Sequence, residues 1–395
     1  MISQADRAKH EALWGMFVAD AIAMPVHWFY NPYDIKRSYG QWLSGYVAPT
    51  ESHPSSILNL SSIGGSGRSG SRRASKPVVG NVILHDKAKY WTSGKKVHYH
   101  RGMSAGDSTL NALTALETIK VMNLEDAHCS LDLETLQAKV MENYVDFMTK
   151  PGTHNDTYAE SFHRLFFKEW SEMESPPRKG EDIVHMAKQR FRSVTAHSED
   201  HQIAVIGALV VAIPWVLHYS HKSADECANA VVSSLQLTHP APSLMPYVEM
   251  YSRLLHSVIN GAQLKDQVIK FISSGVLGRT KKSKIIQNFV DEARQYSDTE
   301  SRLMVYQEGT STLGSACYID GAVSSMLMLA LGFHDDFSGG VLTNANCGGE
   351  NAHRGAALGA LLGANAAING KEIASKWKEG LMFARKQLNQ ATQKI

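Results

Sequence analysis

Cysteine is scarce in this chain, and its pattern excludes two classes of protein. None of the four cysteines in the 395 residues forms a Cys-x-x-Cys pair, and the count is too low for the disulfide framework of a small secreted protein. The first residues also lack the basic, apolar and small-residue order of a secretory signal. We therefore expect a reducing, cytoplasmic location. The cysteines are Cys129, Cys227, Cys317 and Cys347.

The chain also lacks an excess of one charge and a long uninterrupted apolar run. Its 40 Lys and Arg nearly balance its 38 Asp and Glu, so the net charge of +2 predicts no broad surface for nucleic acid. The longest apolar stretch runs from Ile203 to Tyr219 and contains Pro214 and His218. A membrane-spanning helix needs about 20 apolar residues. We expect a buried helix here and no membrane partner.

Alternating strand patterns are weak, whereas helical periodicity is strong. Apolar residues recur at helical spacing from Leu110 to Ile119 and from Val248 to Val258. Three further segments, 203–217, 321–333 and 356–368, are apolar on nearly every face, which is typical of central helices. The sequence predicts an all-α fold with one core, in a single domain covering residues 1–395.

The segment from Glu51 to Asn81 has a different composition. Its run SSIGGSGRSGSRRASKP is rich in Ser, Gly and Arg, which predicts a flexible loop. Gly65, Gly67 and Gly70 match Gly-x-Gly-x-x-Gly, but no strand precedes them, so dinucleotide binding is not favoured. An alternative is a lid that folds over a phosphate-bearing ligand, using Arg68, Arg72, Arg73 and Lys76.

Four motifs combine polar residues with turns or helix starts. GGENAHRGAALGALLGA, 348–364, places Glu350, His353 and Arg354 on a glycine turn before a small-residue helix. The others are VADAIAMPVH at 18–27, GDST at 106–109 and LTHPAP at 237–242. In this order they resemble the motifs of the ADP-ribosylglycohydrolase family, and the resemblance extends from Val18 to about Leu381.

The resemblance implies an all-α fold and hydrolysis of a glycosidic bond to ribose, in a family that usually binds two magnesium ions through acidic motifs. Here the GDST run keeps only Asp107 and Thr109 of its pattern, and the later run keeps Glu350 but has His353 in place of a closing Thr. The acidic residue that ends the first motif is His27. Most magnesium ligands are therefore replaced, and the cofactor remains unknown.

Three interpretations of the altered site remain open. In the one we favour, no metal binds: Asp107 or Glu350 is the base or cation stabiliser, His27 or His353 donates a proton, and Arg354 binds an anion. In the second, His27, Asp107, Glu350 and His353 hold one softer ion such as zinc, manganese or iron. In the third, these groups form a hydrogen-bonded network without activity.

Further residues are candidates for substrate binding. Ser108, Thr109, Asn351 and Arg354 adjoin the expected catalytic groups, and His154, Asn155 and Asp156 line the substrate mouth or cap the following helix. Tyr158 is suited to stacking on a flat aglycone, and His239 either binds substrate or fixes a helix end. We expect His98 and His100 to be exposed, and we attribute the Glu160 and His163 pair to chance.

The sequence thus predicts a glycohydrolase that cleaves a ribosyl N-glycosidic bond or an ADP-ribose conjugate. The expected partner is a small ribosyl or ADP-ribosyl substrate, and the sequence is compatible with an oligomer. The alternative is a catalytically inactive binding or structural protein of the same fold.

Overall fold

The fold is built from helices throughout the part of the chain that the computed structural model describes, residues 2–65, 77–94, 96–194, 198–275, 277 and 281–392. Within these ranges β-structure is limited to isolated bridges, which confirms the all-α prediction. The helices are α1 (Gln4–Ala23), α2 (Tyr33–Tyr39), α3 (Val78–Asn81), α4 (Ala88–Trp91), α5 (Leu110–Glu125), α6 (Leu133–Thr149), α7 (Ser161–Glu172), α8 (Gly180–Ser193), α9 (Gly207–Tyr219), α10 (Ala224–Leu235), α11 (Met245–Ile259), α12 (Leu264–Ser273), α13 (Lys281–Ala293), α14 (Thr299–Leu313), α15 (Ile319–Gly332), α16 (Phe337–Asn346), α17 (Asn351–Ile368), α18 (Ser375–Glu379) and α19 (Arg385–Thr392).

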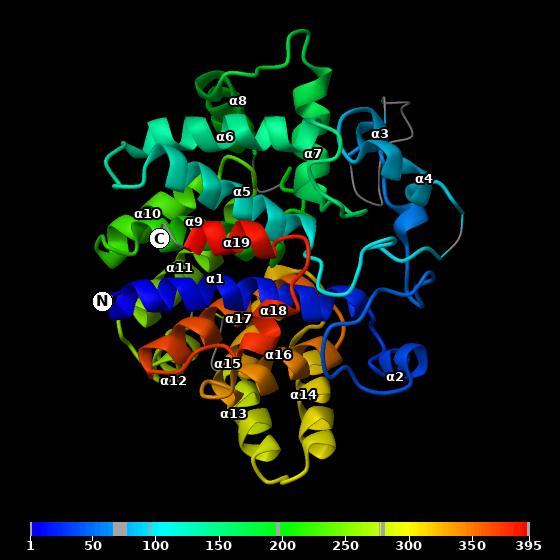
Figure 1. The fold of residues 1–395 in the computed structure, drawn as a ribbon, viewed down its shortest axis with the longest axis vertical. Helices are drawn as coiled ribbons and strands as arrows, with labels where there is room; N and C mark the ends of the chain where they lie inside the picture. Colours follow the sequence, from blue (N-terminus) through cyan, green and yellow to red (C-terminus); the bar gives the residue numbers. More distant parts are fainter. Residues whose placement is uncertain are drawn as a thin grey trace.

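Helices α1 and α17 pack against each other at the centre of the molecule (Figure 1). Their backbones approach so closely that a Cβ on Gly359 would lie 2.1 Å from the carbonyl oxygen of Gly15. One turn later, a Cβ on Gly363 would lie 2.1 Å from the carbonyl oxygen of Glu11. Only glycine fits such a crossing. The antiparallel pair therefore brings the C-terminal end of α1 to the N-terminal end of α17.

The three segments predicted to be central helices are α9, α15 and α17, and each is buried over most of its surface. Helices α5 and α6 lie on one side of α1, and α13 and α14 form a hairpin at the far end (Figure 1). Helix α9 has 13 residues and contains Pro214. Among the described residues, no helix has the length and apolarity needed to cross a membrane.

The segment predicted to be a loop packs against the core where it is described. Leu58, Val78 and Val79 are buried, so both ends of the segment contribute apolar side chains. These three residues flank the run rich in Ser, Gly and Arg, and the flexible loop predicted for that run stays a prediction. Residues 66–76, which include the arginines of the suggested lid, lie outside the described residues.

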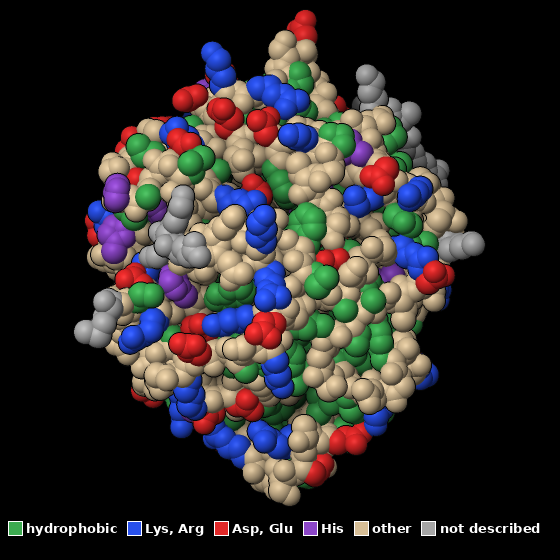
Figure 2. All heavy atoms as spheres, in the orientation of Figure 1, with side chains coloured by type: hydrophobic (Ala, Val, Ile, Leu, Met, Phe, Trp, Pro, Cys, Tyr) green, Lys and Arg blue, Asp and Glu red, His purple; other side chains and the backbone are tan. Residues whose placement is uncertain are grey.

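Acidic and basic side chains are interspersed over the face shown in Figure 2. This distribution agrees with the near balance of charges in the sequence.

Several histidines are buried at a distance from charged partners, and this makes stability depend on pH. Burial lowers the pKa of His53 and His154 to about 4 and that of His239 to about 3. An unfolded histidine titrates near 6.5. Between these values the unfolded chain binds more protons than the folded chain, so the free energy of unfolding falls as pH falls.

We predict that His239→Gln reduces this acid sensitivity. Between pH 6 and pH 4 the slope of unfolding free energy against pH should decrease by about 1.4 kcal/mol per pH unit, the contribution of one histidine. Urea unfolding at a series of pH values measures the slope. The exposed His185 provides the control variant, His185→Gln, which should keep the wild-type slope. Equal slopes in all three proteins would contradict the prediction.

We also predict that Gly359→Ala destabilises the protein by about 3 kcal/mol, because the new methyl group would force the two central helices apart. Gly45→Ala is the control, since a Cβ there would meet no atom within 4 Å. Thermal and urea unfolding compare the two variants. A stability change of the same size in both would show that the helix crossing tolerates a side chain.

Candidate functional site

The first and last motifs meet in a backbone turn beyond the central helix pair. Gly348 and Gly349 both have φ of 65°, and a Cβ on Gly348 would lie 2.2 Å from the carbonyl oxygen of Phe29. The amide of Trp28 donates to the carbonyl of Gly349 at 2.7 Å, and the amide of Gly349 donates to the carbonyl of Phe29 at 2.9 Å. These bonds hold His27 against Glu350, the N-cap residue of α17.

Two histidines and two carboxylates form a buried cluster at this junction. Nε2 of His27 lies 2.6 Å from Oε1 of Glu350, and Nδ1 of His353 lies 3.1 Å from the same oxygen. On its other side Nδ1 of His353 lies 3.3 Å from Oε1 of Glu160, the residue preceding α7. Neither of these two contacts of His353 Nδ1 has the angle of a hydrogen bond. One imidazole is therefore placed between two carboxylates.

The cluster continues through His100 to Asp156. Nδ1 of His27 lies 2.8 Å from Nε2 of His100, and Nδ1 of His100 lies 2.7 Å from Oδ1 of Asp156. A hydrogen bond between two ring nitrogens uses one proton, and each ionised carboxylate takes another. With both carboxylates ionised, the two rings hold three protons and share one positive charge.

The pKa directions show where the charges lie. Burial lowers the pKa of His27 to about 3, so the His27 ring is neutral. Burial opposes ionisation of Glu350, but the neighbouring His27 and His353 lower its pKa well below its usual value. Burial also opposes charging of His353, but Glu160 and Glu350 raise its pKa well above its usual value. The negative Glu350 thus lies between the positive His353 and the neutral His27.

A cavity of about 150 Å³ opens beside this cluster. Its walls include the aromatic rings of Trp28, Tyr99 and Tyr158, and Glu160 belongs both to this wall and to the cluster. The Trp28 ring stacks on His27 with centroids 3.7 Å apart. Oε2 of Glu160 accepts a hydrogen bond from Nδ2 of Asn111 at 2.7 Å, which fixes the carboxylate. Glu160 thus links the cavity to the buried histidines.

The GDST motif lies next to the cluster but uses its polar groups internally. The amide and hydroxyl of Thr109 both donate to Asp20, each at 2.7 Å. Burial raises the pKa of Asp20 to about 6. Asp107 accepts from the amide of Ser104 at 2.7 Å and from Nδ2 of Asn155 at 2.8 Å. The structure therefore brings His27, Glu350 and His353 together and places Asp107 in a separate turn; Ser108 is buried beside it.

Residues around α17 also have internal partners. Arg354 is fully buried and donates to the side chain of Asn344 at 2.8 Å and to the carbonyl of Gly348 at 2.9 Å. Asn351 donates to the carbonyl of Ala345 at 2.8 Å. These two side chains hold the glycine turn, and their described contacts give them no approach to the aromatic cavity.

The segment 154–158 does not cap the helix that follows it, which was one of the two interpretations of its polar residues. Oδ2 of Asp156 accepts from the amide of Leu110 at 2.7 Å, so Asp156 satisfies the start of α5 and not that of α7. Tyr158 lines the cavity and lies parallel to Trp91 with centroids 5.6 Å apart. His154 is buried against Phe147, and His239 stacks on Phe162 at 4.1 Å, away from the cluster.

Sequence reasoning missed three residues in and around the site: His98, His100 and Glu160. His98 and His100 are 0% and 1% exposed, so the prediction that they lie on the surface is wrong. Their alternation along an extended segment does place both rings inward, with Nε2 of His98 bonded to the carbonyl of Pro25 at 2.9 Å. Glu160 was visible only as half of a Glu-x-x-His pair, and that spacing carried little information.

The site does not fit a pair of magnesium ions. Magnesium prefers oxygen ligands, whereas the grouped donor atoms within reach of one another come from His27, Glu350 and His353. The carboxylates of Asp20 and Asp107 are already filled by hydrogen bonds. Oε2 of Glu350 is buried without a hydrogen-bond partner, which makes the three-residue group the described place where a single nitrogen-preferring ion would bind.

Comparisons with known proteins identify the family. The model of the ADP-ribosylglycohydrolase family matches residues 2–395. A solved structure described as an "ADP-ribosylglycohydrolase-related protein complex" is similar over 100% of this chain and 98% of its own, with a TM-score of 0.52 and 15% identity, which shows a shared fold. No curated protein matches the chain. With its all-α fold and the meeting of its first and last motifs, the chain belongs to the ADP-ribosylglycohydrolase family.

Proposed function

We propose that this protein hydrolyses the N-glycosidic bond of a small ribosyl substrate in the aromatic cavity beside Glu160, without the magnesium ions usual for its family. One observation carries the proposal. Glu160 lines the cavity, and its carboxylate lies 3.3 Å from a buried imidazole whose pKa is raised well above the ordinary value. Glycoside hydrolysis needs an acid that protonates the leaving group and a carboxylate that acts as base or stabilises the cationic ring, and these two groups offer both.

The chemistry follows from the order of the groups. As the bond to the aglycone breaks, positive charge develops on the ribosyl ring, and the Glu160 carboxylate stabilises it. His353 first protonates Glu160, which passes the proton to the departing nitrogen and becomes the carboxylate again. Glu160 then takes a proton from the attacking water and returns it to His353. Glu350 keeps His353 charged and oriented from the opposite side, where their atoms are 3.1 Å apart. His27 and His100 hold Glu350 in turn.

The cavity favours a small substrate. About 150 Å³ is less than the 300 Å³ or more of typical sites for drug-sized ligands. The rings of Tyr99 and Tyr158 offer apolar surface to a flat aglycone, and Arg164 adds a cationic group to the wall. We therefore favour a nucleoside-sized glycoside over an ADP-ribosylated protein.

A second candidate is a binding protein without turnover, and the burial of the cluster favours it. The side chains of His27 and Glu350 are 0% exposed, and each is held by the other. Such a network fixes a fold whether or not a reaction takes place. The two functions differ in what they require of Glu160.

We predict that Glu160→Gln loses activity by about 10²-fold or more, the usual contribution of an acid or base in this role. Mass spectrometry detects ribose or ADP-ribose release from a panel of nucleosides, nucleotides and ADP-ribosyl conjugates. Glutamine keeps the size of the side chain and its contact with Asn111. The control is Glu172→Gln at the exposed end of α7, which should retain wild-type turnover.

The panel also separates the two candidates. Wild-type turnover in Glu160→Gln would show that Glu160 is not a catalytic residue. Binding of a panel member by both the wild type and Glu160→Gln, with no product from either, would identify a binding protein.

A separate prediction concerns metal. Protein purified without chelator should contain less than one equivalent of zinc, manganese or iron by elemental analysis, and EDTA should leave its turnover unchanged. One equivalent of an ion that disappears in Glu350→Gln would instead assign His27, Glu350 and His353 as its ligands. A control for unspecific loss is Glu172→Gln, which should retain the metal content of the wild type.

A further inference from the structure

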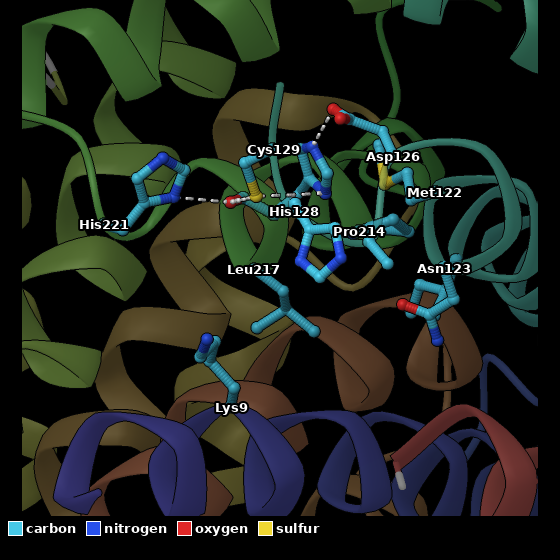
Figure 3. Close-up of a pocket in the computed structure, with 12 residues that line it drawn as sticks. Lys9, Met122, Asn123, Asp126, His128, Cys129, Pro214, Leu217 and His221 are labelled. Carbon is cyan, nitrogen blue, oxygen red and sulfur yellow. Dashed lines mark hydrogen bonds and ion pairs between the residues drawn. The ribbon is translucent and has the colours of Figure 1, made fainter. Parts of the chain in front are cut away.

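A second cavity, of about 300 Å³, lies between α1, α5 and α9 (Figure 3). It shares none of its lining residues with the aromatic cavity. Its described walls contain a cysteine, three histidines and a lysine, a dense set of reactive side chains for a surface cavity. The lining residues with polar chemistry are Lys9, Asn123, Asp126, His128, Cys129, His218 and His221.

Asp126, His218 and Cys129 form a chain of contacts in that order. Oδ2 of Asp126 lies 3.0 Å from Nε2 of His218, and Nδ1 of His218 lies 4.0 Å from Sγ of Cys129. Asp126 accepts the Nε2 proton, which leaves the lone pair of Nδ1 for the thiol. The thiol also lies 3.7 Å from the backbone carbonyl oxygen of His218. A nucleophile, a base and a group that orients the base define a triad by geometry, independently of fold.

The turn that carries Cys129 is strained and firmly held. Cys129 has φ of 51°, a left-handed conformation that costs energy for a residue with a side chain. Its amide donates to the carbonyl of Asp126 at 2.9 Å, and the Asp126 carboxylate accepts the amides of Ser130 and Leu131. Asp126 therefore fixes the turn and the imidazole together. Strain of this kind concentrates at functional sites.

The cavity wall has two chemical characters. Met122, Pro214 and Leu217 form an apolar part of the wall, which suits a short acyl chain. Lys9 points up from α1 toward Leu217, and the rings of His128 and His221 lie on either side (Figure 3). Lys9 also pairs with Asp6 at 2.8 Å, and it is the cationic group of this wall that would face an anionic leaving group.

We propose that Cys129 is the nucleophile of a second hydrolytic site, which cleaves a small ester or thioester with a short acyl chain and an acidic leaving group. In the first step Sγ bonds to the acyl carbon, the bond to the leaving oxygen or sulfur breaks, and His218 moves the thiol proton to the leaving atom. In the second step water attacks the thioester of Cys129, His218 takes its proton and returns it to Sγ, and the acid departs.

The resting thiol is neutral. Burial, together with the charge of Asp126, raises the pKa of Cys129, and burial lowers the pKa of His218 despite its contact with Asp126. His218 is therefore an uncharged base at neutral pH, and it removes the proton as the sulfur attacks. The acidic group in direct contact with His218 is the Asp126 carboxylate. His221, after the end of α9, and Lys9 of α1 face His218 from the same cavity wall.

The test uses 4-nitrophenyl acetate with the full-length protein. Peptide mass spectrometry should find the acetyl group on Cys129 and not on Cys317, which is also partly exposed. Release of 4-nitrophenol should continue past one equivalent, and Cys129→Ser and His218→Gln should each reduce it by about 10²-fold or more. The control for a lost histidine is His185→Gln, an exposed residue on α8, which should keep the wild-type rate.

The pH profile keeps the proposal falsifiable if His218→Gln does not fold. In the wild type the acylation rate should reach a plateau by neutral pH, where His218 is already a free base. An unassisted thiol would instead react faster with each pH unit up to its raised pKa. Such a steady rise, equal labelling of Cys317, or release that stops at one equivalent would overturn the proposal.

Discussion

The contact on which the site depends is the backbone crossing of α1 and α17. Gly15 and Gly359 allow each helix to lie against the carbonyl of the other, and Gly363 repeats the contact one turn along. Because the helices are antiparallel and in close contact, residue 27 at the end of one and residue 350 at the start of the other meet within hydrogen-bond distance. A side chain at the crossing would push the two helices apart and so separate residue 27 from residue 350. Small residues in α17 are thus a condition for the site.

A second constraint is charge balance inside the core. Six buried residues form a chain in which each contacts the next, and each is 4% exposed or less. In order they are Asp156, His100, His27, Glu350, His353 and Glu160. Removing one member would leave a neighbour charged and unpaired in a medium of low dielectric constant, which costs about 3 to 5 kcal/mol. The members are therefore coupled. The members come from segments next to α1, α7 and α17, and Asp156 also accepts from the first amide of α5, so the network ties these four helices to a single arrangement.

Much of the fold was predictable because it follows from local periodicity. The apolar segments around residues 210, 325 and 360 become α9, α15 and α17, since a helix without a polar face can only lie in the centre. His27, Glu350 and His353 were also predictable, through the resemblance of their motifs to a family. The exposure of His100 was predicted wrongly because its partners, His27 and Asp156, lie 73 and 56 residues away. The role of Glu160 was not predicted for the same reason, because the other residues of the cavity wall come from segments far away in the chain.

The composition of the core argues for chemistry over structure alone. A buried ionic network is a poor way to stabilise a fold, since apolar residues of similar size are often neutral or stabilising in its place. The GDST turn shows that this chain can hold its motifs with simple pairs, such as Asp20 with Thr109. Around Glu350 it instead keeps two carboxylates against one imidazole, and one of them reaches a cavity. A charged imidazole between two carboxylates, beside a binding cavity, has a use in acid–base chemistry that a purely structural network would not require.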